Sequence, residues 1–363
     1  MPENNEKEPQ YKSILSDDDG TAPRPIRKKQ RDPMAEVRRE IEEQQRQQRE
    51  KAELLRDIAR VQRDMEQPKA GEIDVYVGIP FCRTRCSYCS FAAVDLKHGE
   101  KLTDGYVEAV TREMQLVRGD LSQYKVRGLY IGGGTPTALT CAQLDRVIGT
   151  ALECFPGARE FTVEAGRPDT LDDEKLRMLR AHGVDRVSLN PQTMNDETLR
   201  RVGRDHTAED IRRMYDEMHG MGFSVINMDL ILGLPGETAE DVARTLDAIA
   251  ELTPENLTVH TLAIKRAAAL RQTGYHADEE EAMRMVELAA HRAREMGYQP
   301  YYLYRQKYMA GNLENVGYCK PGTASIYNVD IMEEIMPIAA FGAGAISKWL
   351  YPAARRIERA PNV

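Results

Sequence analysis

Three cysteines, Cys82, Cys86 and Cys89, follow one another in a C-x3-C-x2-C pattern. This spacing places three thiolates on one short loop. Three thiolates can hold three corners of a cubane iron–sulfur cluster and leave the fourth iron without a protein ligand. A metal with an open coordination position can bind and activate a further ligand. The pattern therefore predicts a [4Fe-4S] cluster that takes part in chemistry.

Two other interpretations of the cysteine triplet are less consistent with the sequence. A zinc site usually has four ligands in two Cys or His pairs, but no second pair lies nearby: the next candidates downstream are His98 and then Cys141. A disulfide framework belongs to secreted proteins, but the chain begins without an apolar leader and shows no apolar run of membrane-spanning length. Six cysteines in 363 residues predict a reducing, cytoplasmic setting. Cys141 and Cys154 are expected to be ordinary thiols.

Composition and charge separate a polar head from the rest of the chain. The formal net charge is −8, so nucleic acid is not expected as a general partner. Residues 1–33 are charged, show no apolar period and are predicted to be a disordered tail. Residues 34–70 are rich in Glu, Gln, Arg and Lys and predict a charged helix. Apolar residues at helical spacing appear mainly in its second half, at Leu54, Ile58 and Val61.

Beyond residue 70 the chain alternates between strand and helix patterns. Helical apolar stripes, for example at Val107, Val110 and Met114, separate the strand-like runs. This rhythm indicates βαβ units and a parallel sheet, as an open doubly wound sheet or a partial barrel. The predicted strands are residues 73–79, 126–131, 161–164, 187–192, 225–232 and 257–264.

Each predicted strand delivers polar side chains or bare backbone to its carboxyl end, where α/β folds gather their chemistry. The first strand runs into the cysteine loop, and the second ends in residues 132–137 (GGGTPT). Glu164, Gln192 and Asp229 follow on later strands, where they could bind the amine and hydroxyl groups of an adenosylmethionine. His260 is expected to be a core imidazole rather than a substrate contact.

The triple glycine favours close approach of backbone to a ligand. It lacks the Lys-Ser/Thr of a P-loop and the G-x-G-x-x-G of a dinucleotide fold. Beside a cluster loop on the neighbouring strand, it predicts backbone contact with an amino acid-like ligand.

These motifs together resemble the radical S-adenosylmethionine superfamily. Within it, residues 76–82 (YVGIPFC), 132–137 and 229–235 (DLILGLP) resemble the oxygen-independent coproporphyrinogen III oxidases. Four later stretches resemble their HemZ-like branch, the coproporphyrinogen dehydrogenases: residues 163–169 (VEAGRPD), 190–195 (NPQTMN), 259–266 (VHTLAIKR) and 302–307 (YLYRQK).

The resemblance implies an α/β fold, a partial (β/α)6 TIM-like radical SAM barrel, with a small α+β C-terminal region. The barrel core would span residues 71–265, and residues 266–363 would form a substrate or lid region. The implied cofactors are the [4Fe-4S] cluster on Cys82, Cys86 and Cys89, and S-adenosylmethionine (SAM) on its open iron. By position in the matching motifs, the residues expected to contact SAM are Tyr76, Tyr88, Gly133, Gly134, Thr135, Glu164, Gln192, Arg204, Asp229, Ala263 and Ile346.

The activity that the resemblance implies is oxidative decarboxylation of coproporphyrinogen III propionates to vinyl groups, giving protoporphyrinogen IX in haem biosynthesis. A reduced cluster would cleave SAM, and the resulting 5′-deoxyadenosyl radical would take a hydrogen atom from the propionate. The partners would be a tetrapyrrole, an electron donor and an electron acceptor. Arg305 and Lys307 are the expected substrate cations. A haem-binding chaperone related to these oxidases and a radical SAM enzyme for another substrate are the alternatives.

Overall fold

The computed structural model describes residues 34–306 and 313–362. The predicted tail, residues 1–33, and the expected substrate cation Lys307 lie outside this range. The chain divides into two compact units, Met1–Lys51 and Ala52–Val363. The domain boundaries expected at residues 33, 70 and 265 stay predictions. Among the described residues no helix is both long enough and apolar enough to cross a membrane.

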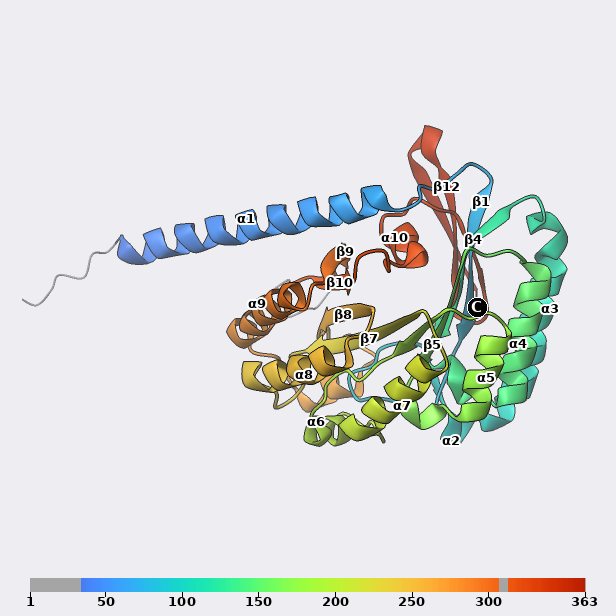
Figure 1. Ribbon diagram of the computed structural model, residues 1–363, viewed down its shortest axis with the longest axis horizontal. Coiled ribbons are helices and arrows are strands. Elements are labelled where there is room, and N and C mark those ends of the chain that lie inside the picture. Colours follow the sequence, from blue (N-terminus) through green and yellow to red (C-terminus); the bar gives the residue numbers. More distant parts are fainter. Residues whose placement is uncertain (1–33, 307–312, 363) are drawn as a thin grey trace, which may run out of the picture. The chain divides into compact units, whose positions relative to one another are not determined.

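One mixed sheet dominates the second unit (Figure 1). Its strands, in spatial order, are β13 (Arg356–Pro361), β12 (Ile346–Tyr351), β11 (Ile338–Phe341), β1 (Glu72–Ile79), β4 (Lys125–Gly133), β5 (Glu160–Gly166), β6 (Arg186–Leu189), β7 (Val225–Leu232), β8 (Asn256–Thr261), β10 (Asn315–Cys319) and β9 (Gln299–Tyr304). The short strands β2 (Phe81–Cys82) and β3 (Val94–Asp95) pair separately.

The helices are α1 (Ala35–Asp64), α2 (Leu96–Gly99), α3 (Thr103–Leu121), α4 (Cys141–Cys154), α5 (Asp173–Ala181), α6 (Asp196–Arg201), α7 (Ala208–Gly220), α8 (Ala239–Leu252), α9 (Glu279–Glu295) and α10 (Ile326–Met332). Helices α3, α4, α5, α7 and α8 lie along the outer side of the parallel strands (Figure 1). Several begin at capping boxes that satisfy their first amides, such as Thr140 with Gln143 and Thr238 with Asp241.

The six strands β1, β4, β5, β6, β7 and β8 run parallel in sequence order. A doubly wound sheet reverses its strand order at a switch point. These six strands show no such reversal, so the predicted partial (β/α)6 barrel is confirmed. Both flanks continue in antiparallel strands, and β11 pairs parallel with β1. All parallel strands therefore present their carboxyl ends at one edge.

Alternation along the strands separates the two faces of the barrel wall. On β7, Asn227, Asp229 and Ile231 line an internal cavity, whereas Met228 and Leu230 are buried in the hydrophobic core under the helices. A strand alternates faces at every residue. The inner face of this wall is therefore partly polar and only partly filled.

The second half of α1 belongs to the barrel unit. Ile58 and Val61 are buried there, and the Gln62 side chain donates to the Tyr301 carbonyl at 3.0 Å. Val37 and Ile41, in the first half, are exposed. The apolar spacing in the sequence thus marks the part of the helix that has a packing partner.

Buried charges join α10 to the amino ends of the parallel strands. Asp74 on β1 is fully buried, and one of its oxygens accepts the Gly128 amide at 2.9 Å. Arg127 on β4 pairs with Asp330 of α10 at 2.6 Å. Burial, together with the nearby charge of Asp330, raises the pKa of Asp74 to about 8. The folded chain therefore holds a proton here that the unfolded chain releases near pH 4.

Replacing this carboxyl should change how stability depends on pH. Between about pH 4 and 8 the folded wild type binds the extra proton, so its unfolding free energy falls as pH rises, by at most about 1.4 kcal/mol per pH unit from this group. Asp74→Asn keeps the acceptor for Gly128 and has no proton to lose. In denaturant titrations we expect the unfolding free energy of the variant, measured relative to that of the wild type, to increase as pH rises from 5 to 8.

The matched control is Asp120→Asn, at an exposed position of α3. It should leave the pH dependence of unfolding as it is in the wild type. Parallel pH profiles for wild type and Asp74→Asn would refute a raised pKa at this position.

Candidate SAM and cluster site

A cavity of about 690 Å³ opens at the carboxyl ends of the parallel strands. The three cysteines line it, and so does every residue that the sequence assigns to SAM: Tyr76, Tyr88, Gly133, Gly134, Thr135, Glu164, Gln192, Arg204, Asp229, Ala263 and Ile346. The structure thus brings residues more than 260 positions apart in the chain to one site. Their roles as ligand contacts stay predictions.

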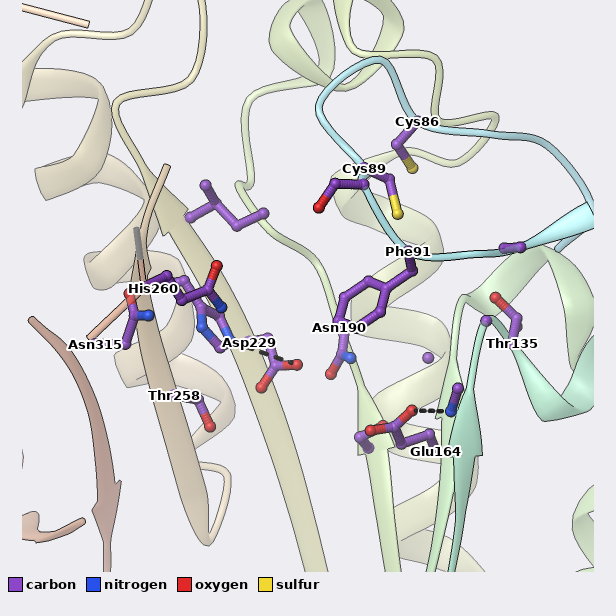
Figure 2. Close-up of a pocket in the computed structure, with 18 of the residues that line it drawn as sticks. Cys86, Cys89, Phe91, Thr135, Glu164, Asn190, Asp229, Thr258, His260 and Asn315 are labelled. Atoms are coloured by element: carbon purple, nitrogen blue, oxygen red, sulfur yellow. Dashed lines mark hydrogen bonds and ion pairs between the residues drawn. The ribbon is translucent and has the colours of Figure 1, made fainter. Parts of the chain in front are cut away.

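The cysteine loop hangs over the mouth of this cavity. Figure 2 shows the thiols of Cys86 and Cys89 directed from the loop toward the cavity. All three thiols are free, and Cys86 is the most buried of them. Burial raises the pKa of Cys82 and Cys89, so both hold their protons until a metal displaces them.

The triple glycine supports this loop from the neighbouring strand. The Gly134 amide donates to the Ile79 carbonyl and the Thr135 amide to the Phe81 carbonyl, both at 2.8 Å. A Cβ at Gly134 would lie 2.7 Å from the Phe81 oxygen and 3.0 Å from the Cys82 sulfur. Gly133 adopts φ 116°, a region closed to ordinary side chains. Only glycine lets the two backbones approach this closely.

The donor set suits a cluster better than a single ion. Within residues 34–306 and 313–362, no three His, Cys, Asp or Glu side chains gather closely enough to hold one metal ion. In a cubane each thiolate binds a different iron, so the three sulfurs must be spread around a larger body. Three free thiols facing one cavity meet that requirement and leave one iron for another ligand.

A fully buried arginine links the cluster loop to the cavity wall. Arg204 donates to the Asn190 carbonyl at 2.6 Å, to the Tyr88 hydroxyl at 3.2 Å and to the Cys86 sulfur at 3.9 Å. Its Nε has no partner among the described residues, and neither do Gln192 Oε1 and Asn190 Oδ1. Buried polar atoms are rarely left unpaired, so these three indicate a missing polar ligand. A ligand carboxylate would satisfy the guanidinium.

Two carboxylates lie on the opposite side of the cavity. Glu164 accepts the Tyr130 hydroxyl at 2.6 Å and the Gly133 amide at 3.0 Å. Burial raises the pKa of Glu164 to about 7. Asp229 is partly buried, but the nearby His260 ring and the side-chain amide of Asn227, which donates to it at 2.8 Å, keep its pKa below the ordinary value. The pair offers acceptors for an ammonium group and for hydroxyls.

His260 is not a core residue, contrary to the expectation from its apolar strand. Its Nε2 lies 3.9 Å from Asp229, its Nδ1 lies 3.0 Å from the Tyr304 hydroxyl, and the ring lines the cavity. Side chains on β8 point alternately to the two faces of the sheet: Leu257 and Val259 pack in the core, and Thr258 and His260 face the cavity. Other cavity residues that sequence reasoning missed come from the strand ends, the antiparallel strands and α10: Asn190, Asn227, Thr258, Asn315, Tyr327, Asn328 and Lys348.

Arg305, expected to bind substrate carboxylates, does not line this cavity. It follows the end of β9, is half exposed and pairs with Glu314 at 3.0 Å. The sequence around Arg305 could not show whether its side chain would point into the cavity or away from it.

The comparisons with known proteins agree with this geometry. Residues 76–249 match the model of the radical SAM superfamily. These residues form a radical SAM domain. The cofactors of the chain are therefore a [4Fe-4S] cluster and SAM, and the three thiols and the unpaired polar atoms of the cavity fit both groups.

The relatives named here are proteins of haem metabolism or similar to them. The chain is 44% identical over 287 residues to the oxygen-independent coproporphyrinogen-III oxidase-like protein HemZ of Bacillus subtilis, covering 77% of this chain and 57% of that protein. It is 34% identical over 193 residues to the haem chaperone HemW of the same organism, covering 52% and 50%. The solved coproporphyrinogen III oxidase HemN of Escherichia coli aligns with TM-score 0.64 and 26% identity, covering 76% and 64%. The chain spans about half the length of the named relatives that it matches.

The raised pKa of Glu164 gives a pH signature for SAM binding. An ammonium group binds the ionised carboxylate, so below about pH 7 binding must also remove a proton, and affinity should fall by up to about tenfold per pH unit. Calorimetry on the anaerobically reconstituted protein should therefore show tighter SAM binding at pH 8 than at pH 6. In Glu164→Gln the affinity should be lower and this pH dependence lost.

A matched control is Glu237→Gln, because burial also raises the pKa of Glu237 to about 7 but its carboxylate bonds to Thr193 and does not line the cavity. It should keep the wild-type pH profile of SAM binding. Equal profiles for wild type and Glu164→Gln would remove Glu164 from the ligand site.

Proposed function

We propose that the chain is a radical SAM oxidoreductase that converts propionate side chains of coproporphyrinogen III into vinyl groups. In each conversion the propionate loses a hydrogen atom, carbon dioxide and one electron, so an external electron acceptor is needed. The cluster and SAM, when bound, supply the one-electron chemistry. Similarity to HemZ and HemN supports this choice of substrate. A cytoplasmic location stays a prediction.

The observation that carries the proposal is a wall of tyrosines in the same cavity as the residues expected to bind SAM. The rings of Tyr130 and Tyr327 stack with centroids 4.4 Å apart, and Tyr76 stacks on Tyr130 at 6.1 Å. Tyr302 and Tyr304 of β9 form a second stacked pair at 6.4 Å. All five line the cavity. Broad aromatic faces suit a large, mostly apolar ring system.

The same cavity is lined by cations that could pair with the propionate carboxylates of such a ring system. Lys348 of β12 and Arg359 of β13 line the cavity. Both pair with the single carboxylate of Glu334, so the three side chains together keep one positive charge. Lys348 is only 13% exposed, and a charge shielded from water acts more strongly on a ligand carboxylate. We assign to these two residues the substrate-binding role that was expected of Arg305.

The second candidate is a haem-binding chaperone. Its support is the similarity to HemW, which extends to the Escherichia coli protein at 27% identity over 290 residues. A tyrosine-lined cavity with cations would also hold haem, so the cavity alone does not separate the two functions.

Product analysis separates them. The reconstituted protein is incubated without oxygen with coproporphyrinogen III, SAM, a reductant and an electron acceptor. We expect 5′-deoxyadenosine and vinyl-bearing porphyrinogen to form together. Lys348→Met should lower kcat/KM for the porphyrinogen about tenfold or more, as expected for loss of a charged contact worth about 1.4 kcal/mol.

The control is Lys320→Met, since Lys320 pairs with Glu255 at the other end of β8 and does not line the cavity. It should keep wild-type kinetics. Stoichiometric haem binding without either product would favour the chaperone, and 5′-deoxyadenosine without a vinyl product would point to another substrate.

A further inference from the structure

Three chain segments around the outer side of the cysteine loop are rich in cations, although the whole chain carries a net charge of −8. They are residues 83–91, 200–206 and 264–274. Apart from the buried Arg204, their cations form what is called here the cationic rim: Arg83, Arg85, Arg200, Arg201, Lys265, Arg266 and Arg271. The same segments contain one carboxylate, Asp205.

The three segments are neighbours in space as well. In the cysteine loop, the Ser87 amide donates to the Val202 carbonyl at 3.0 Å, and the Ser87 carbonyl accepts the Leu270 amide at 2.8 Å. The Arg85 guanidinium donates to the Ala267 carbonyl at 3.2 Å. The loop is thus held between the turn after α6 and the segment after β8. The cations of the rim are therefore carried by three segments that contact one another.

Most of the rim is exposed and lacks acidic partners. Arg83 pairs with Asp169 at 3.7 Å and Arg201 with Glu197 at 2.5 Å. Within the described part of the chain, the other five rim residues form no ion pair. Exposed charges that serve stability are usually paired or interspersed with opposite charges. A cluster of one sign instead creates a local potential that attracts an oppositely charged partner.

The position of the patch indicates which partner it serves. The thiols face the cavity, where SAM and substrate are expected to bind. Arg83 and Arg85 of the same loop are exposed to solvent, and Arg85 also lines the cavity. Chemistry at the cluster requires one electron from outside the chain. We propose that the cationic rim docks an acidic one-electron carrier protein against the outer side of the cysteine loop.

The electron transfer itself is simple. The reduced carrier loses one electron and the oxidised cluster accepts it; no covalent bond forms or breaks. Encounters of this kind use small, polar interfaces in which charge complementarity sets the association rate more than the affinity. The inference rests on the cluster and not on the tetrapyrrole, so it can hold or fail independently of the proposed substrate.

Charge reversal at two rim positions tests the docking surface. Arg266→Glu combined with Arg271→Glu changes two exposed side chains that do not line the cavity. The probe is a reduced plant-type ferredoxin of acidic composition, mixed anaerobically with the reconstituted protein while cluster reduction is followed by stopped flow. At low salt we expect the second-order rate constant to fall about tenfold or more. Oxidised ferredoxin should also bind the variant more weakly in calorimetry.

Two controls separate docking from damage to the site. Photoreduced 5-deazariboflavin is uncharged and should reduce wild type and variant equally fast, with equal iron content. Arg118→Glu with Arg294→Glu makes the same change of net charge in the last turns of α3 and α9, which lead into the amino ends of β4 and β9. This control pair should keep the wild-type rate with ferredoxin.

Salt dependence of the wild type gives a test that needs no variant. The rate with ferredoxin should fall as ionic strength rises from about 0.05 to 0.5 M, because screening shortens the reach of the rim charges. A rate that ignores salt, or an equal loss in the control pair, would overturn the proposal. So would an unchanged ferredoxin rate in the rim variant together with salt-sensitive binding of an RNA oligonucleotide that the variant loses.

Discussion

The site depends on the close contact between two backbone segments, the cysteine loop after β1 and the triple glycine at the end of β4. Two backbone hydrogen bonds hold these segments together, and a Cβ at Gly134 would meet both the Phe81 oxygen and the Cys82 sulfur. Because β1 and β4 are neighbouring parallel strands, their carboxyl ends are already adjacent. The glycines turn that adjacency into contact and fix the loop over the cavity.

Some residues that line the cavity lower the stability of the fold, because their backbone is strained or their polar atoms lack a partner. Gln192 holds φ 68°, and its side-chain oxygen is buried without a partner in the described chain. Strained backbone costs on the order of 1–3 kcal/mol, and an unsatisfied buried polar atom a similar amount. The bridge from Gln192 to Leu230 of β7 keeps the residue in place. A polar ligand that pairs with Gln192, Asn190 and Arg204 would recover part of this free energy on binding.

Much of the fold and of the candidate SAM site could be predicted from the sequence, because both depend on short motifs and on strands that pair in sequence order. Strand patterns gave β7 with its observed ends, and the parallel rhythm placed Glu164, Gln192 and Asp229 at one edge. His260 was misjudged because an apolar strand does not show which of its alternating faces is lined by core.

The substrate side was harder to predict for a different reason. Tyr327 comes from α10, and Lys348 comes from an antiparallel strand at the flank of the sheet. Their approach to the barrel is set by long-range contacts, such as the Arg127–Asp330 pair, and no short motif encodes these. Arg305, the cation expected from the sequence, instead pairs with Glu314 outside the cavity.

The central claim is that the chain supplies three thiolates and leaves one iron of its cluster for SAM. The most direct measurement is electron paramagnetic resonance of the reduced, anaerobically reconstituted protein with and without saturating SAM. A ligand on the open iron changes its electronic environment, so the cluster signal should shift when SAM is added. A spectrum that is identical with and without SAM would contradict the claim, and so would purified protein that carries zinc in place of the cluster.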